Sequence, residues 1–293
     1  MNRSGELIRN KVAKVTLLFW IIKILATTLG ETGGDAMSMT LGLGYAVSSL
    51  IFGAAFLVAL VAQLSSRRLH PTLYWAVIVT TTTVGTTMAD FADRSLGIGY
   101  IGGSLLLLSL TLLSLGAWRL IVGSISMDRI VSRQAEAFYW FTILFSNTLG
   151  TALGDFLADD SGLAFIGAAA VFAGLLIIVA GIWFFTRAPH DLLFWAAFVL
   201  TRPLGATLGD LLTKTREAGG FELSRFGSTA VVAVAMIGLA MYSARRIRRD
   251  AISRRPQKYR VPITISLAGS DTPFKSAPIG AKPPALPVGP SDY

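Results

Sequence analysis

Four aspartates of this 293-residue chain stand at the same place in a recurring pattern. Each follows a glycine by five residues and a tryptophan by fifteen, and the residue before it is glycine or alanine. The four are Asp35, Asp90, Asp155 and Asp210. A carboxylate binds a proton or a hard cation, so four equivalent carboxylates form the first candidate for a chemical site.

The positions that accompany these aspartates define four copies of one repeat. The tryptophans are Trp20, Trp75, Trp140 and Trp195, at spacings of 55, 65 and 55 residues. Copies one and three, and copies two and four, are therefore offset by 120. His70 and His190 precede their tryptophans by five residues in copies two and four only. This pattern indicates a hairpin that was duplicated and a pair that was duplicated again.

Hydroxyl and carboxyl side chains share one helix face before each aspartate. In copy one Thr28, Glu31 and Asp35 follow the spacing i, i+3, i+7. Copies two and three repeat the face, and copy four departs from it with Pro203 and Ala206. Such a face is typical of a cation pathway, and the predicted cation-binding or relay groups are Asp35, Asp90, Asp155, Asp210, Glu31, Thr28, Thr83 and Thr148. The alternative is that the aspartates only end their helices at a wet interface.

Two basic residues fall within the same helices as the acids. Five acids against Lys23 and Arg202 leave a net charge of −3, which protons or a bound cation would have to neutralise. Arg202 stands where other copies have threonine or asparagine, and is expected to be a fixed counter-ion or a tethered cation displaced during transport. Lys23 is the second predicted counter-ion, close enough to its tryptophan to snorkel to the interface.

Small residues and histidines complete the motif. The glycines at small-xxx-small spacing are predicted to let helices approach closely, and they are Gly30, Gly34, Gly85, Gly150, Gly154, Gly205 and Gly209. His70 and His190 lie beside Pro71 and Pro189, which favours a role at a helix start; handling of protons is the alternative.

The composition requires a membrane for these helices. The chain is 53% hydrophobic and 15% charged, with a mean hydropathy of +0.61. Its apolar runs predict an all-α fold of eight spanning helices, as four parallel helical-hairpin repeats with pseudo-twofold symmetry. The spans are expected at about 15–37, 43–64, 72–94, 98–120, 138–159, 163–185, 191–213 and 226–244. Residues 15–244 thus form the membrane domain, with repeats at about 15–64, 72–120, 138–185 and 191–244.

Basic residues orient this domain. Twenty Lys and Arg fall on the side of the termini and four on the other, which places residues 1–14 and 245–293 in the cytoplasm of a bacterial inner-membrane protein. The tail begins with a basic cluster, expected to bind anionic lipid, and continues as a Pro-rich disordered segment. The net charge of +9 is therefore not a nucleic-acid signal, and a homo-oligomer is left open.

Several kinds of chemistry are excluded or disfavoured. The chain has no cysteine and only two histidines, so no cofactor is expected and any metal would be a hard, oxygen-ligated ion of unknown identity. An intramembrane aspartyl protease would need Gly-x-Gly-Asp, whereas the chain reads Thr32-Gly33-Gly34-Asp35. We therefore expect no enzyme.

With these hairpins in hand, the chain resembles an uncharacterised family of bacterial membrane-anchored proteins built from a repeat of unknown function. The resemblance covers about residues 15–244 and includes the threonine-rich approach at 80–83. It implies the topology and no substrate. From the residues we expect a secondary transporter or channel for a small cation, a hard metal ion or one coupled to protons. The alternative is a non-transporting membrane scaffold or regulator that acts through its basic tail.

Overall fold

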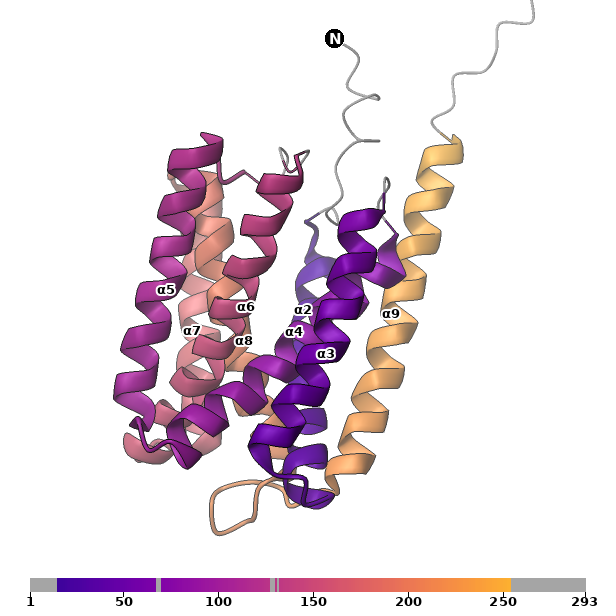
Figure 1. The fold of residues 1–293 in the computed structure, drawn as a ribbon. Helices are drawn as coiled ribbons and strands as arrows, with labels where there is room; N and C mark the ends of the chain where they lie inside the picture. The colour runs from indigo at the N-terminus through magenta and orange to yellow at the C-terminus, as the bar shows by residue number, and fades with distance from the viewer. Residues whose placement is uncertain (1–14, 67–69, 127–129, 131, 254–293) are drawn as a thin grey trace, which may run out of the picture. The chain divides into compact units, whose positions relative to one another are not determined.

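The computed structural model describes residues 15–66, 70–126, 130 and 132–253, and all regular structure in these ranges is helical. Four helices carry the aspartate motif and are called the motif helices: α2 (Leu17–Asp35), α4 (Pro71–Asp90), α6 (Arg133–Asp155) and α8 (His190–Thr213). The four that alternate with them are the outer helices: α3 (Gly44–Ser65), α5 (Gly99–Val122), α7 (Ala164–Phe185) and α9 (Arg225–Ser253). Figure 1 shows these helices gathered in one bundle.

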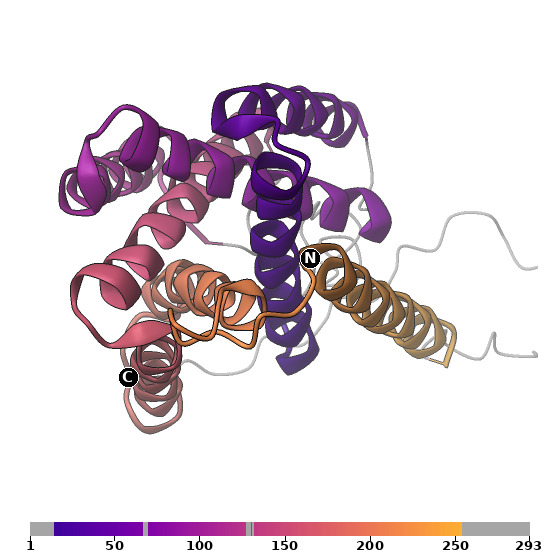
Figure 2. The same cartoon turned by 90° about the horizontal axis from the view of Figure 1, so that it is seen from below.

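The motif helices form a closed ring. α2 packs against α4 and α8, and α6 packs against the same two helices. Figure 2 views this arrangement from the end that carries the loop of residues 214–224. Each outer helix packs on the motif helix of the following copy: α3 on α4, α5 on α6, α7 on α8, and α9 on α2. The four copies are therefore interlocked in a cycle, because the two helices of a repeat belong to different packing pairs.

Glycines allow the close contacts of this ring. A Cβ atom placed on Gly30 would lie 2.2 Å from the hydroxyl of Thr82, and one on Gly205 would lie 1.9 Å from that of Thr27. Gly150 likewise faces the side chain of Arg202, and Gly85 faces the backbone of Thr148 at 3.1 Å. Every copy thus presents its glycine to the neighbouring motif helix, in the same cyclic order as the packing.

The polarity of the bundle is reversed relative to a water-soluble protein. Leu50 on α3 and Val234 on α9 are more than 70% exposed, at 75% and 72%, whereas the threonines of the ring are buried. Six of the eight helices are long and apolar enough to cross a membrane. α4 and α6 are not among these six, but they occupy the same places in the ring as α2 and α8. The chain is a multi-pass membrane protein.

The motif helices end differently in the fourth copy. α2, α4 and α6 continue beyond their aspartates as five-residue π-helical turns, η1 (Ala36–Thr40), η2 (Phe91–Ser95) and η4 (Phe156–Asp160). α8 ends at Thr213 instead, and residues 214–224 form a longer loop. Single π-helical turns occur frequently at functional sites, and these three lie directly after the motif carboxylates.

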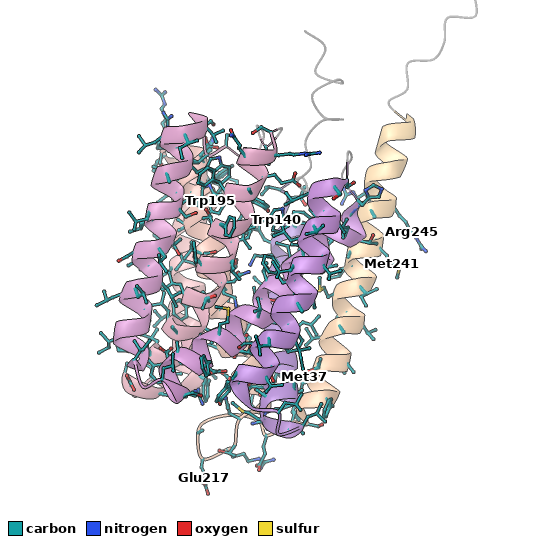
Figure 3. The ribbon with its side chains drawn as sticks, in the orientation of Figure 1. Met37, Trp140, Trp195, Glu217, Met241 and Arg245 are labelled. Carbon is teal, nitrogen blue, oxygen red and sulfur yellow. The ribbon has the colours of Figure 1, made fainter. Side chains whose placement is uncertain are left out.

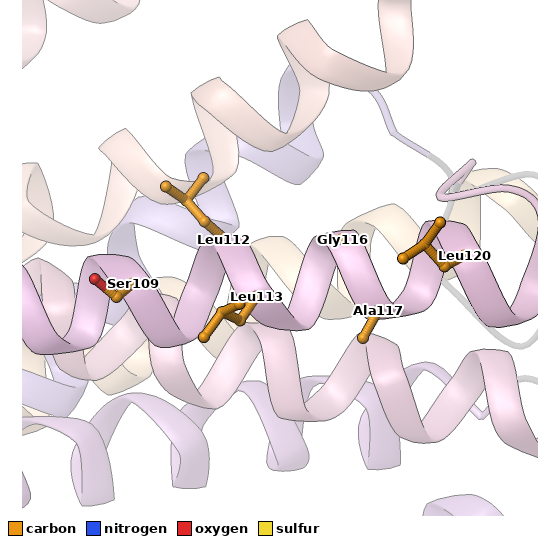
Figure 4. A pocket seen from close by; sticks show the side chains of 6 residues that line it. All are labelled: Ser109, Leu112, Leu113, Gly116, Ala117 and Leu120. Carbon is orange, nitrogen blue, oxygen red and sulfur yellow. The ribbon is translucent and has the colours of Figure 1, made fainter.

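The helix bounds differ from the predicted spans mainly at the last helix. α9 continues as far as Ser253, into the segment that was expected to be a basic tail after residue 244. The predictions for residues 1–14 and 254–293 concern parts outside the described residues. On its outer surface α5 carries a shallow apolar depression around Leu112, Leu113 and Gly116 (Figure 4).

Candidate functional site

The polar positions of the motif helices form successive layers along the ring. Trp140 and Trp195 lie near one end of the bundle, and Met37 and Glu217 lie near the other (Figure 3). Along each motif helix, the repeat spacing places the Lys23 position first after the tryptophan, then the Arg202 position, then the Glu31 position and finally the aspartate. We call each set of four equivalent positions a layer.

Arg202 occupies the middle of the ring and contacts three other motif helices. Its Nη1 donates to Glu31 Oε2 at 3.0 Å, and its Nη2 donates to the hydroxyls of Thr86 and Thr151, both at 2.6 Å. Thr86 also donates to Glu31 Oε2 at 3.2 Å. Glu31, Thr86 and Thr151 are equivalent residues of copies one to three, so one guanidinium ties three copies to the fourth. Arg202 is thus paired with Glu31, and its role as a fixed counter-ion or as a tethered cation displaced during transport stays a prediction.

Lys23 does not snorkel, so that expectation is wrong. Its side chain is fully buried, at 0% exposure. Its Nζ donates to Asn147 Oδ1 at 3.3 Å and lies 4.3 Å from the centre of the Phe198 ring. Among the described residues no carboxylate pairs with Lys23, because Arg202 already holds Glu31 and the aspartates lie at the far end of the ring.

The four motif aspartates are buried and fall into two pairs. Their exposures are 1–3%. Arg94 joins the first pair: its Nε lies 3.0 Å from Asp90 Oδ1, and its Nη2 lies 3.1 Å from Asp155 Oδ2. Asp159, which is more exposed, lies at 4.0 Å from the same guanidinium. We call Asp90, Asp155 and Arg94 the Arg94 half.

Lys214 joins the second pair in the same way. Its Nζ lies 3.2 Å from Asp210 Oδ1 and 3.4 Å from Asp35 Oδ2, and Arg225 Nε lies 3.8 Å from the same oxygen of Asp35. Burial lowers the pKa of Lys214, but the carboxylates of Asp210 and Asp35 outweigh it and raise that pKa well above its usual value. We call Asp35, Asp210, Lys214 and Arg225 the Lys214 half.

These pairings correct the predicted charge balance. The excess of −3 counted only Lys23 and Arg202, whereas Arg94, Lys214 and Arg225 also reach the buried acids. Five acids then face five bases. These three are among the four bases counted on the side opposite the termini, and they were not expected to pair with the aspartates. The sequence contains a pattern that predicts this pairing. Arg94 and Lys214 each follow a motif aspartate by four residues, and they are offset by 120 residues, as the two histidines are.

The remaining predicted residues lie apart from the carboxylates. Thr83 and Thr148 donate to carbonyls of their own helices, at 2.9 Å to Val79 and 2.9 Å to Leu144. His70 directly precedes α4, where Ser66 Oγ lies 2.9 Å from its Nδ1. His190 begins α8 and stacks on Trp183. Both histidines are exposed at helix starts, at the opposite end of the motif helices from the aspartates.

The described residues contain no group of three or more His, Asp or Glu side chains that could hold a metal ion. The carboxylates are separated into pairs by Arg94 and Lys214, so they do not form the single four-carboxylate centre that a common axis would allow. A mobile cation would therefore meet two carboxylates and one tethered base at the Arg94 half, and two carboxylates and two tethered bases at the Lys214 half.

Fold and site together define a class: a multi-pass helical membrane protein of four interlocked repeats, each with a buried aspartate. The chain belongs to the family described as Repeat of Unknown Function (DUF347), whose model matches residues 18–69, 73–122, 138–188 and 193–249. The four matched segments coincide with the four copies. Comparisons with curated proteins and with solved structures gave no match.

Proposed function

We propose that this protein is a secondary transporter of a small cation in the bacterial inner membrane, with both termini in the cytoplasm. One observation carries the proposal: each pair of buried aspartates is bridged by a basic side chain from the equivalent position, Arg94 or Lys214. A tethered base between two carboxylates occupies the place that a free cation of like charge would take.

The mechanism follows from charge balance. Buried carboxylates are stable only with a compensating positive charge. When Arg94 or Lys214 turns away, a cation must replace it, and when the cation leaves, the base must return. Both bases are attached beyond the end of the motif α-helix, one on the π-helical turn η2 and one where α8 has ended. Backbone rearrangement there costs fewer helical hydrogen bonds than it would within a helix.

Arg202 fills the ring between the aspartates and the tryptophan end of the bundle. The guanidinium is fully buried and bonded to Glu31, Thr86 and Thr151, so it blocks a continuous path along the axis. A permanently open channel is therefore the less favoured version of cation movement. Pro203, inside α8 and next to Arg202, removes one backbone donor at this level and provides a place for α8 to bend.

The test is a flux survey of the purified protein in liposomes, with Na⁺, K⁺, Li⁺, Mg²⁺ and Mn²⁺ supplied one at a time. Asp90→Asn and Asp155→Asn preserve size and hydrogen bonding but remove the charge that a cation needs, so each should abolish flux of the transported ion. Glu217→Gln, at an exposed loop position, is the matched control and should retain it. Full flux in all four motif Asp→Asn variants would refute the mechanism.

The equality of five acids and five bases favours a second candidate, a non-transporting scaffold or regulator. Because these five acids are balanced by five bases of the same chain, they do not require a free cation. In that case the wild type moves no cation in the flux survey, and the four Asp→Asn variants change only stability. Removal of residues 254–293 would then abolish the biological effect of the protein, whereas a transporter would keep its flux.

A further inference from the structure

Lys23 is a buried cation in a layer that packing alone would fill with apolar side chains. The equivalent residues of the other copies are Ile78, Ile143 and Phe198, all at 0% exposure. An unpaired charge in such a place is expensive, and ionisable residues inside spanning bundles mark functional sites by default. The cost of Lys23 therefore requires an explanation that core packing does not supply.

Lys23 differs from Arg202 in its ability to release a proton. A guanidinium in a protein keeps its proton, and Arg202 is held by a carboxylate at 3.0 Å. A lysine can exist as an ammonium or as a neutral amine, and burial without a carboxylate removes the main reason to stay charged. Of the two buried bases in the ring, Lys23 is the one that can change its charge.

The neighbours of Lys23 can accommodate both forms. The ammonium donates to Asn147 Oδ1, while Asn147 Nδ2 donates to Thr81 Oγ1 at 3.1 Å. Rotation of this amide would turn a donor toward a neutral amine. The other buried base of the ring is Arg202 on α8. Around this layer α4 and α6 contribute Ile78, Thr81 and Asn147, none of which titrates, and α9 has no ionisable side chain between residues 226 and 241.

We propose that Lys23 is the proton-binding residue that couples cation movement to protons. In one state the ammonium is held by Asn147 and Phe198; in the other it releases one proton to water, keeps its electron pair and remains as a neutral amine. This inference rests on the proposed function and names its energy source. Cation and proton then use different parts of the ring, the aspartate end and the Lys23 layer.

Two substitutions fix Lys23 in opposite states. Lys23→Met has a similar length and no charge, and Lys23→Arg is permanently protonated. Ile78→Met is the matched control, since it changes the equivalent residue of copy two. In liposomes with a pH indicator inside, wild type and Ile78→Met should move protons against the transported cation. Both Lys23 variants should reduce this proton movement to that of empty liposomes, and Lys23→Met should also unfold at a higher temperature than wild type.

A second measurement does not depend on transport. In protein labelled with ¹⁵N at the lysine side chains, the Nζ signal missing from Lys23→Met belongs to Lys23. We expect its chemical shift to change with pH across the physiological range. A constant shift, or proton movement in Lys23→Met equal to wild type, would overturn the inference and leave cation transport intact. A titrating Lys23 in a wild type that moves no cation would instead overturn the proposed function and support Lys23 as a proton-binding group.

Discussion

The Arg94 half and the Lys214 half are related by the 120-residue offset, yet they differ in charge. The Arg94 half contains two buried aspartates and one base, with Asp159 at the margin. The Lys214 half contains two aspartates and two bases, because Arg225 adds a second contact to Asp35. Arg225 is the first residue of the outer helix α9. The first turns of the outer helices α3 and α5 carry an uncharged residue instead, Tyr45 and Tyr100.

This difference shows that the packing of the helices and the positions of the basic side chains follow different symmetries. The helices pack in a cycle of four equivalent contacts, each with a glycine. The bases follow the later duplication and come once in every two copies. Arg225 then breaks even this twofold relation. The Arg94 half has one base for two buried aspartates. We therefore expect it to bind a mobile cation more readily than the Lys214 half.

The largest loss of stability should come from removing Arg94, because no second base in the described part of the chain contacts its two aspartates. Arg94→Gln leaves two buried carboxylates without a cation, and it should lower the free energy of unfolding by about 3 kcal/mol. Lys214→Gln should cost roughly half as much, since Arg225 remains beside Asp35. The measurement is equilibrium unfolding in detergent. Arg216→Gln, which removes an exposed charge from the same loop as Lys214, should change stability by less than about 0.5 kcal/mol.

Equal losses for Arg94→Gln and Lys214→Gln would show that Arg225 contributes nothing and that the two halves are equivalent.

A smaller effect is expected for Arg225 alone. At 3.8 Å and with a partly exposed side chain, its contact with Asp35 should be worth about 0.5–1 kcal/mol. In the absence of Lys214 it becomes the remaining partner, so Arg225→Gln should cost more in the Lys214→Gln background than in wild type. A double-mutant cycle measures this coupling directly. Strict additivity of the two substitutions would mean that Arg225 does not compensate for Lys214.

The sequence predicted the repeat, the eight helices and the equivalence of the aspartates, because fixed spacing translates directly into position along a helix. It also placed Arg202 among the polar positions of the ring. It did not predict that α3 packs on α4, since the order of packing around a ring depends on the loops and on all four copies together.

The pairing of the aspartates was missed for a related reason. Charge counts on either side of a membrane treat every basic residue as part of a loop. Arg94 lies within the π-helical turn η2, which carries it back over Asp90. Arg225 reaches Asp35 from the far end of the chain, over 190 residues, because α9 packs on α2. Only the closed ring brings these two segments together.

Exchanging the two bases should also have small effects on stability. Arg94 uses separate atoms, Nε for Asp90 and Nη2 for Asp155, whereas Lys214 presents one Nζ to both of its partners. Arg94→Lys should therefore lower the free energy of unfolding by about 1 kcal/mol, because a single ammonium replaces a planar guanidinium whose separate donors contact the two aspartates. Lys214→Arg should be nearly neutral. A loss for Lys214→Arg as large as that for Arg94→Lys would indicate that the second half is too narrow for a guanidinium.

High pH distinguishes the same two bases further. The pKa of Lys214 is raised in the folded protein by Asp210 and Asp35, against the effect of burial. A base with a raised pKa contributes its full stability below the unfolded value, about 10.4 for lysine, and loses it only as pH rises through the higher folded value. The stability gap between wild type and Lys214→Gln should therefore stay constant from neutral pH to about 10 and shrink only above it. In Lys214→Arg the gap should persist beyond that point, because arginine keeps its proton. A gap that closes already near pH 8 would show that the carboxylates do not hold the charge of Lys214, and the tethered-base mechanism would lose one of its two sites.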